Sequence, residues 1–248
     1  MRHDPLKVLF SRTFILFFFL GTRGEALVLP GNLSQSNVNR IVQIVEQGSL
    51  LRLYRSAESY VAFPGIKFGV TSGMLLTQNI SNLGNQVSDI PSALVLPGLY
   101  VAKGLGQQLE VGLQYWPSGA LLDWGNIGGN LKWTWMDERY SLVSGAFFGA
   151  ASHCTAFRNA YSGNSLELGV VFSKDFVQIR PYGGMGALFS EGTLSPALVA
   201  SPAVQNTGYS NGLHAFVGIE TELTLDLAFQ FDWLGAGPAF GMLLGKHF

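Results

Sequence analysis

The feature that most constrains the fold is the strict alternation of side chains in residues 223–233. Every second position carries a large apolar residue, and the positions between them carry small or polar ones. A period of two places the two sets on opposite faces of an extended strand. The apolar set, which we expect to face lipid, consists of Leu223, Leu225, Leu227, Phe229, Phe231 and Trp233.

Weaker alternation recurs from residue 65 to the C-terminus, and it predicts about ten strands. We place them near residues 66–76, 94–103, 108–116, 127–136, 141–151, 165–174, 177–189, 211–220, 224–233 and 238–248. Most connections alternate between long (77–93, 117–126, 152–164, 190–210) and short, as in transmembrane barrels with long loops on one side and short turns on the other. Eight or twelve strands are alternatives, because residues 77–103 and 211–233 can be divided differently. A secreted β-sandwich is the competing fold, since its strands also alternate.

The composition favours the membrane solution. Only 12% of the residues are charged, and there are 31 glycines. Beyond residue 26 the sequence has no run of about 18 apolar residues, so it cannot cross a bilayer as helices. A closed barrel satisfies every backbone group between strands. The sequence therefore predicts an all-β fold, a transmembrane antiparallel up-and-down β-barrel over residues 65–248.

The N-terminus has the pattern of an export signal. Basic residues precede a short apolar core at residues 14–20, and small residues at Gly24 and Ala26 suit cleavage near Ala26. An uncleaved anchor is the alternative. The chain has 15 basic and 16 acidic side chains, and the predicted signal peptide at residues 1–26 would remove four and two of them. The acidic excess that remains argues against a nucleic-acid partner.

Between the signal and the barrel, residues 27–64 are predicted to form a helical or irregular segment. An amphipathic helix is expected at residues 35–47, with Ser34 or Ser36 as its N-cap and Gly48 as its stop. Its apolar stripe consists of Val38, Ile41, Val42 and Val45.

The face opposite the lipid-facing set supplies the candidate lumen residues. These are Lys67, Glu110, Lys132, Glu167, Arg180, His214, Glu220, Asp226 and Asp232. Because barrels of about eight strands are filled by side chains and open pores need about 16–18, ten strands argue against a wide channel. We expect these residues to form buried ion pairs and hydrogen bonds. A lining that selects small solutes or ions is the alternative.

The same parity also points apolar residues inward. They are Leu75, Val143, Phe147, Val171, Phe216 and Leu243, together with Gly145, Gly149, Gly241 and Gly245. Three explanations stay open: the helix at 35–47 covers them, a lipid or hydrophobic ligand covers them, or β-bulges shift the parity.

Aromatic residues near strand ends suggest interfacial girdles. They are Tyr115, Trp116, Trp133, Trp135, Trp233 and Phe248. Cys154 is the only cysteine, and a free thiol in a loop is expected. Ser152, His153 and Cys154 are adjacent, yet no third group is evident to orient a base, so no catalytic residue, cofactor or metal is predicted.

The barrel region resembles small bacterial outer-membrane barrels of the OmpA-like and OmpW-like class. Phe240, Met242, Leu244 and Phe248 resemble the C-terminal signal read by the barrel-assembly machinery, and Lys246 departs from that pattern. Residues 131–134 and 180–186, with the N-terminal helix, are similar to porin-like barrels of predatory bacteria.

The resemblance implies a bacterial outer-membrane location, with outer-membrane lipids and the barrel-assembly machinery as partners. The function expected is a non-enzymatic structural or narrow porin-like barrel with a largely filled lumen. The alternatives are a barrel that binds lipid or a hydrophobic ligand or forms a homo-oligomer, and, more remotely, a barrel lipid hydrolase or acyltransferase.

Overall fold

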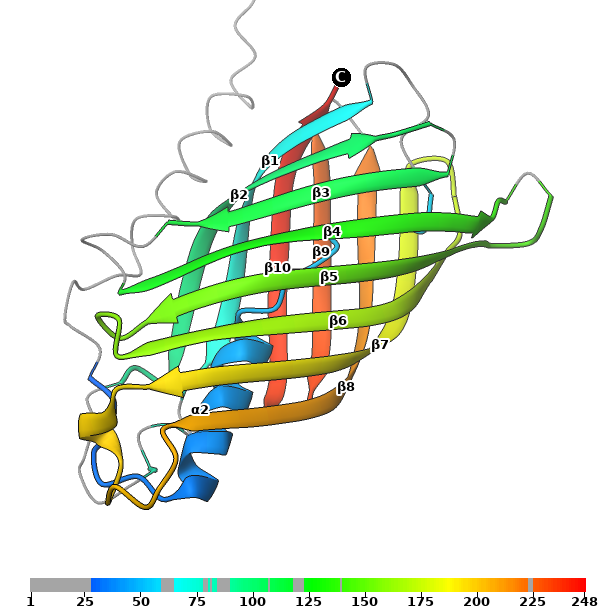
Figure 1. The fold of residues 1–248 in the computed structure, drawn as a ribbon. Helices are drawn as coiled ribbons and strands as arrows, with labels where there is room; N and C mark the ends of the chain where they lie inside the picture. The colour runs from blue at the N-terminus through cyan, green and yellow to red at the C-terminus, as the bar shows by residue number, and fades with distance from the viewer. Residues whose placement is uncertain are drawn as a thin grey trace, which may run out of the picture.

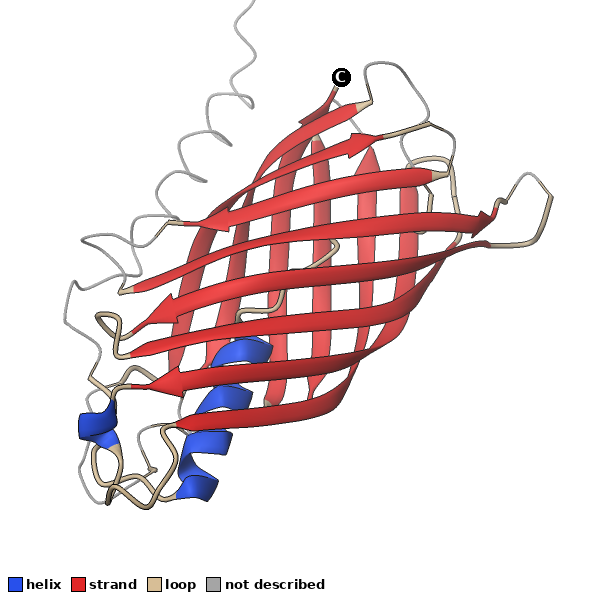
Figure 2. Ribbon diagram, in the orientation of Figure 1, coloured by secondary structure: helices blue, strands red, loops and turns tan. Residues whose placement is uncertain are grey.

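The chain forms one closed barrel with a helix at one mouth (Figures 1 and 2). The computed structural model describes residues 28–58, 65–77, 80, 82–83, 90–106, 108–117, 123–138, 140–222 and 225–248. The predicted signal peptide at residues 1–26 and its cleavage site lie outside the described residues, as does Leu223.

Ten antiparallel strands make up the barrel, and each pairs with its neighbours in the sequence. They are β1 (Ile66–Leu76), β2 (Ala93–Gly104), β3 (Leu109–Trp116), β4 (Trp124–Met136), β5 (Ser144–Ala156), β6 (Tyr161–Ser173), β7 (Ile179–Leu194), β8 (Thr207–Glu222), β9 (Asp226–Leu234) and β10 (Gly237–His247). Pairing of β1 with β10 from Lys67↔His247 to Met74↔Phe240 closes the sheet. The predicted fold class and strand number are confirmed.

The single described α-helix confirms the amphipathic pattern. Helix α2 (Gln35–Gly48) begins at the N-cap Ser34, whose hydroxyl accepts a hydrogen bond from the backbone N–H of Asn37. All four residues of the predicted apolar stripe are buried. Among the described residues, no helix is long and apolar enough to cross a membrane.

The two mouths of the barrel differ. The helix mouth contains α2, the described residues 77, 80, 82–83 and 90–92, the loop 195–206 and, within that loop, the short 3-10 helix η1 (Pro196–Leu198). The C-terminal mouth contains Phe248, the described residues 105–106 and 108 between β2 and β3, 137–138 and 140–143 between β4 and β5, and the connection 174–178 (Figure 1). Leu33 forms a parallel bridge with Val199, so the chain preceding α2 is tied to the loop between β7 and β8 at the helix mouth.

The predicted long loop at residues 152–164 is wrong. β5 and β6 continue through it, and only residues 157–160 form the turn, where Phe157, Arg158 and Asn159 have positive φ. The outward side chains of this extension are polar, including His153 and Asn164, so the sequence there resembles that of a loop rather than of a lipid-facing strand. The strands therefore continue beyond the apolar band of the outer wall at the helix mouth.

The phase of β5 also differs from the prediction by one residue. Phe147 points outward, where it stacks on Trp133, while Phe148 is buried inside. Gly145 and Gly149 face outward as well, and Val143 precedes the strand. A shift of one residue exchanges the faces of a whole strand, and the consecutive apolar residues 146–148 give no contrast to set the phase.

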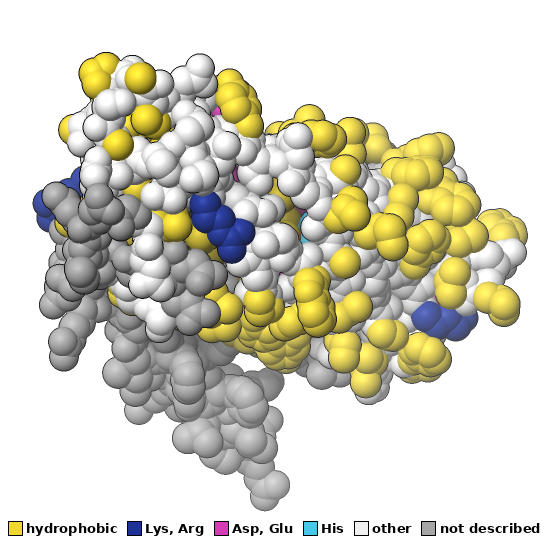
Figure 3. All heavy atoms as spheres, turned by 90° about the horizontal axis from the view of Figure 1, so that it is seen from below, with side chains coloured by type: hydrophobic (Ala, Val, Ile, Leu, Met, Phe, Trp, Pro, Cys, Tyr) yellow, Lys and Arg dark blue, Asp and Glu magenta, His cyan; other side chains and the backbone are white. Residues whose placement is uncertain are grey.

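The outer wall is apolar around the barrel. Figure 3, which views the molecule from below the orientation of Figure 1, shows hydrophobic side chains spread over this face of the wall and few basic ones. Of the side chains expected to face lipid, Leu225, Phe229, Phe231 and Trp233 are exposed and Leu227 is half-buried on the same face. Phe240 and Phe248 are exposed too, and Met242 and Leu244 share their face.

One predicted girdle residue is placed differently. Trp116 is buried inside the barrel, because Tyr115 takes the outward position at the end of β3. Gly98 makes room for it: a Cβ atom there would lie 2.0 Å from Cδ1 of the indole. Trp133, Trp135 and Trp233 are exposed on the outer wall, as expected of interfacial aromatics.

Candidate functional site

The lumen is occupied by the chain's own N-terminal region. Helix α2 packs against the inner wall at the helix mouth, and residues 49–57, which we call the lumen segment, continue from it between the walls of the barrel (Figure 1). All nine residues of this segment are buried. The chain thus enters at the helix mouth and runs toward the C-terminal mouth before β1 begins.

Apolar side chains of the lumen segment cover apolar parts of the inner wall. Leu53 and Ala57 cluster with Phe148, Val171 and Phe216. Further along the wall, Tyr54 packs in a cluster with Tyr100 and Leu243. Leu75, at the helix mouth, belongs to the cluster that includes the buried stripe of α2. The inward apolar residues are therefore covered by residues 38–57.

Backbone groups of the segment are held by side chains of the wall. The N–H groups of Tyr54, Ser56 and Ala57 donate to Gln230, Glu220 and Ser173 at 3.2, 3.1 and 3.0 Å. In return, Lys132 Nζ donates to the carbonyl oxygens of Ser56 and Glu58, both at 2.7 Å, and Thr134 Oγ1 donates to that of Ala57 at 2.6 Å. In this way the wall satisfies backbone groups of a segment that is not itself part of the strand ladders.

Arg52 forms the first ionic contact between the segment and the wall. Its Nε lies 2.5 Å from Asp232 Oδ2, and both side chains are buried. The other carboxylate oxygen of Asp232 accepts from Gln230 at 2.7 Å and lies 3.2 Å from His214 Nε2. His214 Nδ1 is 2.7 Å from Glu167, so both ring nitrogens face carboxylate oxygens, as an imidazolium requires.

Arg55 forms the second. Its guanidinium donates to Glu110 Oε2 at 2.6 Å, and its Nε lies 3.7 Å from Glu220. Lys132 stands 3.6 Å from the same oxygen of Glu110, and Lys67 donates to Glu220 at 3.0 Å. Each of the two carboxylates is shared between one cation of the wall and one of the segment.

The segment completes the charge balance of the buried lumen. The buried wall carries five carboxylates, on Glu110, Glu167, Glu220, Asp226 and Asp232, and three cationic groups, on Lys67, Lys132 and His214. The two arginines of the lumen segment raise the number of cationic groups to five. Uncompensated buried charge is strongly unfavourable, so the wall is matched to a filled lumen rather than an empty one.

Eight of the nine predicted lumen residues lie in this buried network, and Arg180 lies apart. Arg180 is half-buried at the C-terminal mouth, where it contacts Asp175, Glu222 and Glu58. Asp226 joins the network through Lys67 at 3.5 Å and contacts His247 at 3.0 Å. No three of the His, Cys, Asp and Glu side chains in the described ranges are arranged to hold a metal ion.

No role for Arg52, Arg55 or Glu46 was predicted from the sequence. Both arginines occur in an apolar run, Leu50–Leu51–Arg52–Leu53–Tyr54–Arg55, which is the one signal that could have indicated a charged segment inside a barrel. Glu46 is buried at the helix mouth and accepts a hydrogen bond from Tyr161 at 2.8 Å. Burial there raises the pKa of Glu46 to about 8.

The adjacent residues weighed as an enzyme site are separated by the alternation of β5. His153 points outward, where its ring is 2.9 Å from Asn164 Oδ1. Ser152 and Cys154 point inward, and Cys154 is a buried free thiol in a strand rather than in a loop. A base must lie within hydrogen-bond reach of its nucleophile, so these three residues form no catalytic pair.

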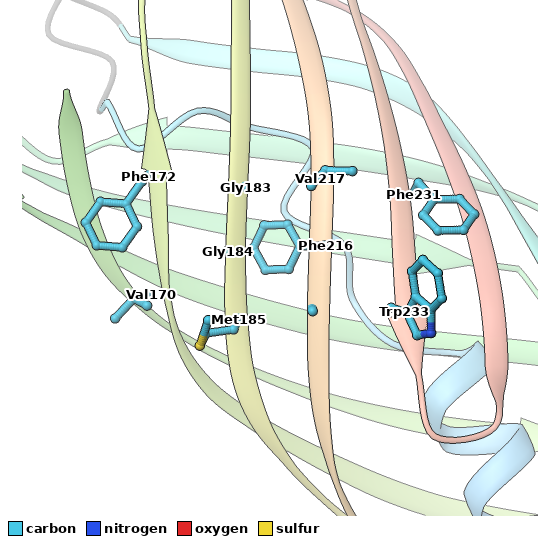
Figure 4. A pocket seen from close by; sticks show the side chains of 10 residues that line it. Val170, Phe172, Gly183, Gly184, Met185, Phe216, Val217, Phe231 and Trp233 are labelled. Atoms are coloured by element: carbon cyan, nitrogen blue, oxygen red, sulfur yellow. The ribbon is translucent and has the colours of Figure 1, made fainter.

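The outer wall has a hollow of about 380 Å³ between β6 and β9. Gly183 at its floor has no side chain, and Phe172, Met185, Phe231 and Trp233 surround it (Figure 4). Apolar residues line nearly all of it, as on a surface in contact with lipid or with another apolar wall.

The closed antiparallel sheet, its apolar outer wall and its charged, filled lumen define the class of the protein as a transmembrane β-barrel. Solved structures similar to the chain are outer-membrane and surface proteins of bacteria. A loop L8 deletion mutant of OmpT, an outer membrane protein of Vibrio cholerae, matches with a TM-score of 0.31 and 11% identity over 62% of this chain and 54% of that one. The chain thus spans about half the length of that protein.

Two smaller proteins are matched over nearly their whole length. Ail, the attachment invasion locus protein of Yersinia pestis, has a TM-score of 0.28 and 15% identity over 73% of this chain and 94% of its own. Neisserial surface protein A has a TM-score of 0.30 and 8% identity over 73% and 92%. No protein-family model and no curated protein matches the chain. At such low scores and identities, the class of the protein rests on the sheet and walls of this chain itself.

Proposed function

We propose that this protein is a non-enzymatic barrel of the bacterial outer membrane, with a structural or narrow porin-like role and a lumen closed by its own N-terminal segment. The observation that carries the proposal is the ionic contact of Arg52 and Arg55 with carboxylates on opposite parts of the inner wall. A bound segment of this kind leaves little room for solute. The apolar outer wall supports the membrane location.

Planar-bilayer recording of the full-length protein tests the proposal. The wild type should give little or modest conductance, and the Arg52→Met/Arg55→Met variant should give larger or more frequent openings, since it removes both cations of the lumen segment. Arg158→Met is the matched control, because Arg158 is an exposed arginine of the β5–β6 turn. Steady conductance of a wide pore in the wild type would contradict the proposal, as would a double variant that conducts no more than the control.

The second candidate is a homo-oligomeric or hydrophobic-ligand-binding barrel, and the hollow above Gly183 is the observation in its favour. Filling that hollow with Gly183→Leu should convert oligomers to monomers, measured as mass in mild detergent, if the hollow receives a second barrel. A wild type that is monomeric and free of ligand under those conditions would exclude this candidate.

Assembly in the outer membrane is part of the proposal. Phe248 closes the β10 end of the sheet through mutual backbone hydrogen bonds with Ile66 at 2.9 and 3.2 Å. Its exposed ring and the outward side chains of Phe240, Met242 and Leu244 are available to the barrel-assembly machinery. Deleting Phe248 should lower the amount of folded barrel in the outer membrane, measured as the heat-modifiable band on gels, and an unchanged band would contradict this role.

A further inference from the structure

The outer wall also carries a groove that is larger than the hollow above Gly183 and lies on different strands. It crosses the outer faces of β10, β1, β2, β3 and the start of β4, and its volume is about 720 Å³. Its outward side chains include Phe68, Val70, Leu99, Leu113, Tyr115 and Leu244. A volume of this size is typical of sites for whole small ligands.

The groove is apolar along its length and has a cation at one end. Lys246 lines it beside the C-terminal mouth, where its Nζ lies 5.3 Å from the centroid of the Phe248 ring. Across the neighbouring strand, Phe68 pairs with both Lys246 and Val101, and Lys103 follows Val101 on the outward face toward the same mouth.

These two lysines stand out on the outer wall. Of the described strand residues, the outward-facing charged side chains are Lys103, Lys246 and Glu191, and Glu191 lies toward the opposite mouth on β7. The end of the groove at the C-terminal mouth therefore carries the positive charge of Lys246, and Lys103 adds a second ammonium group on the outward face of β2. An apolar groove that ends in ammonium groups is complementary to a phospholipid, because its apolar part can contact acyl chains and an ammonium group can bind the phosphate.

We propose that this groove binds one phospholipid of the bilayer, with its acyl chains along Val70, Leu99 and Leu113 and its phosphate beside Lys246. The ammonium group donates charge-assisted hydrogen bonds to the phosphate oxygens. The acyl chains cover the apolar floor of the groove and keep it out of contact with water, which is favourable for apolar surface. The inference rests on the membrane location in the proposed function but not on a closed lumen.

Native mass spectrometry of the full-length protein in mild detergent tests the site, with phosphatidylglycerol as one probe and the matching diacylglycerol, which lacks the phosphate, as the other. The wild type should bind one phosphatidylglycerol about tenfold more tightly than diacylglycerol. Lys246→Gln should remove that preference and Lys246→Arg should keep it. Lys174→Gln is the control, because Lys174 lies at the same mouth but is paired with Glu138.

A second variant tests the apolar part of the groove. Val70→Trp should reduce binding of both probes by placing an indole between β10 and β2, while Val217→Trp, on the far wall, should not. Equal binding of the two probes to the wild type would overturn the proposal without any variant. Unchanged preference in Lys246→Gln, or a wild type that gains a second copy of the chain instead of lipid, would overturn it as well. A negative lipid result together with low conductance would leave the closed-lumen proposal standing.

Discussion

Replacing Arg55 with methionine tests how strongly the lumen segment is held. Removing one partner of a buried ion pair costs about 3–5 kcal/mol. Both carboxylates that face Arg55 keep a second cation, since Lys132 remains 3.6 Å from Glu110 and Lys67 remains 3.0 Å from Glu220. We therefore expect the lower end of the range, about 3 kcal/mol, in the free energy that holds the segment in the lumen. This corresponds to a rise on the order of a hundredfold in the population with the segment released.

Hydrogen exchange measured by mass spectrometry reports that population directly. The amides of Tyr54, Ser56 and Ala57 donate only to side chains of the wall. In the Arg55→Met variant, in detergent micelles, they should therefore exchange on the order of a hundredfold faster than in the wild type. Amides in the paired ladder of β5 and β6 serve as the internal control and should not change. Unchanged exchange at the three amides, in a barrel that is still heat-modifiable, would refute the reasoning.

The double variant Arg55→Met/Glu110→Gln separates the ion pair from the loss of the arginine side chain itself. Removing both charges of a buried pair is close to neutral, whereas removing one leaves an uncompensated charge. Exchange in the double variant should therefore return most of the way to the wild-type rate. A double variant as open as Arg55→Met would show that packing of the arginine stem, and not charge, holds the segment.

Three further outcomes are expected. Because burial raises the pKa of Glu46 from 4.5 to about 8, docking of α2 should be strongest below pH 4.5 and weaken as the pH rises toward 8. Hydrogen exchange of the helix measures this pH dependence, and Glu46→Gln should flatten it. A wild-type protein whose helix docking does not change with pH would contradict the prediction. Gly98→Ala forces a Cβ against Trp116 and should lower barrel stability by about 1–3 kcal/mol in urea unfolding, and no loss would show that the indole moves freely. If the C-terminal mouth faces the periplasm, Val28→Cys at the helix mouth should react with an impermeant maleimide on intact cells. Val177→Cys, at the C-terminal mouth, should react only after permeabilisation. The reverse pattern would place the helix mouth in the periplasm instead.

The strands were predictable because one physical contrast repeats along them. Where lipid lies on one side and charged or small side chains on the other, as in β9, the period of two gives both the strand and its faces. β1 was located to the residue for this reason. β5 was found with the wrong phase, since Ala146, Phe147 and Phe148 are all apolar and offer no contrast.

The content of the lumen was not predictable in the same way. Residues 49–57 have no periodicity, because their environment is set by the surrounding wall rather than by a face of a helix or strand. The prediction identified the carboxylates of the wall but not their partners in the segment, since pairing across more than 50 residues leaves no local pattern. Trp116 was misplaced for a related reason: the space for its ring comes from Gly98 on the next strand.

The position of the lumen segment ahead of β1 in the chain has a consequence for assembly. Residues 49–57 lie inside a ring that is completed only when the first and last strands pair, so the segment has to be in place before or as this seam forms. An empty ring would enclose carboxylates lacking two of their five counterions. We therefore expect the barrel to close around its own N-terminal segment. Arg52 and Arg55 would then neutralise the wall carboxylates before or while β1 pairs with β10.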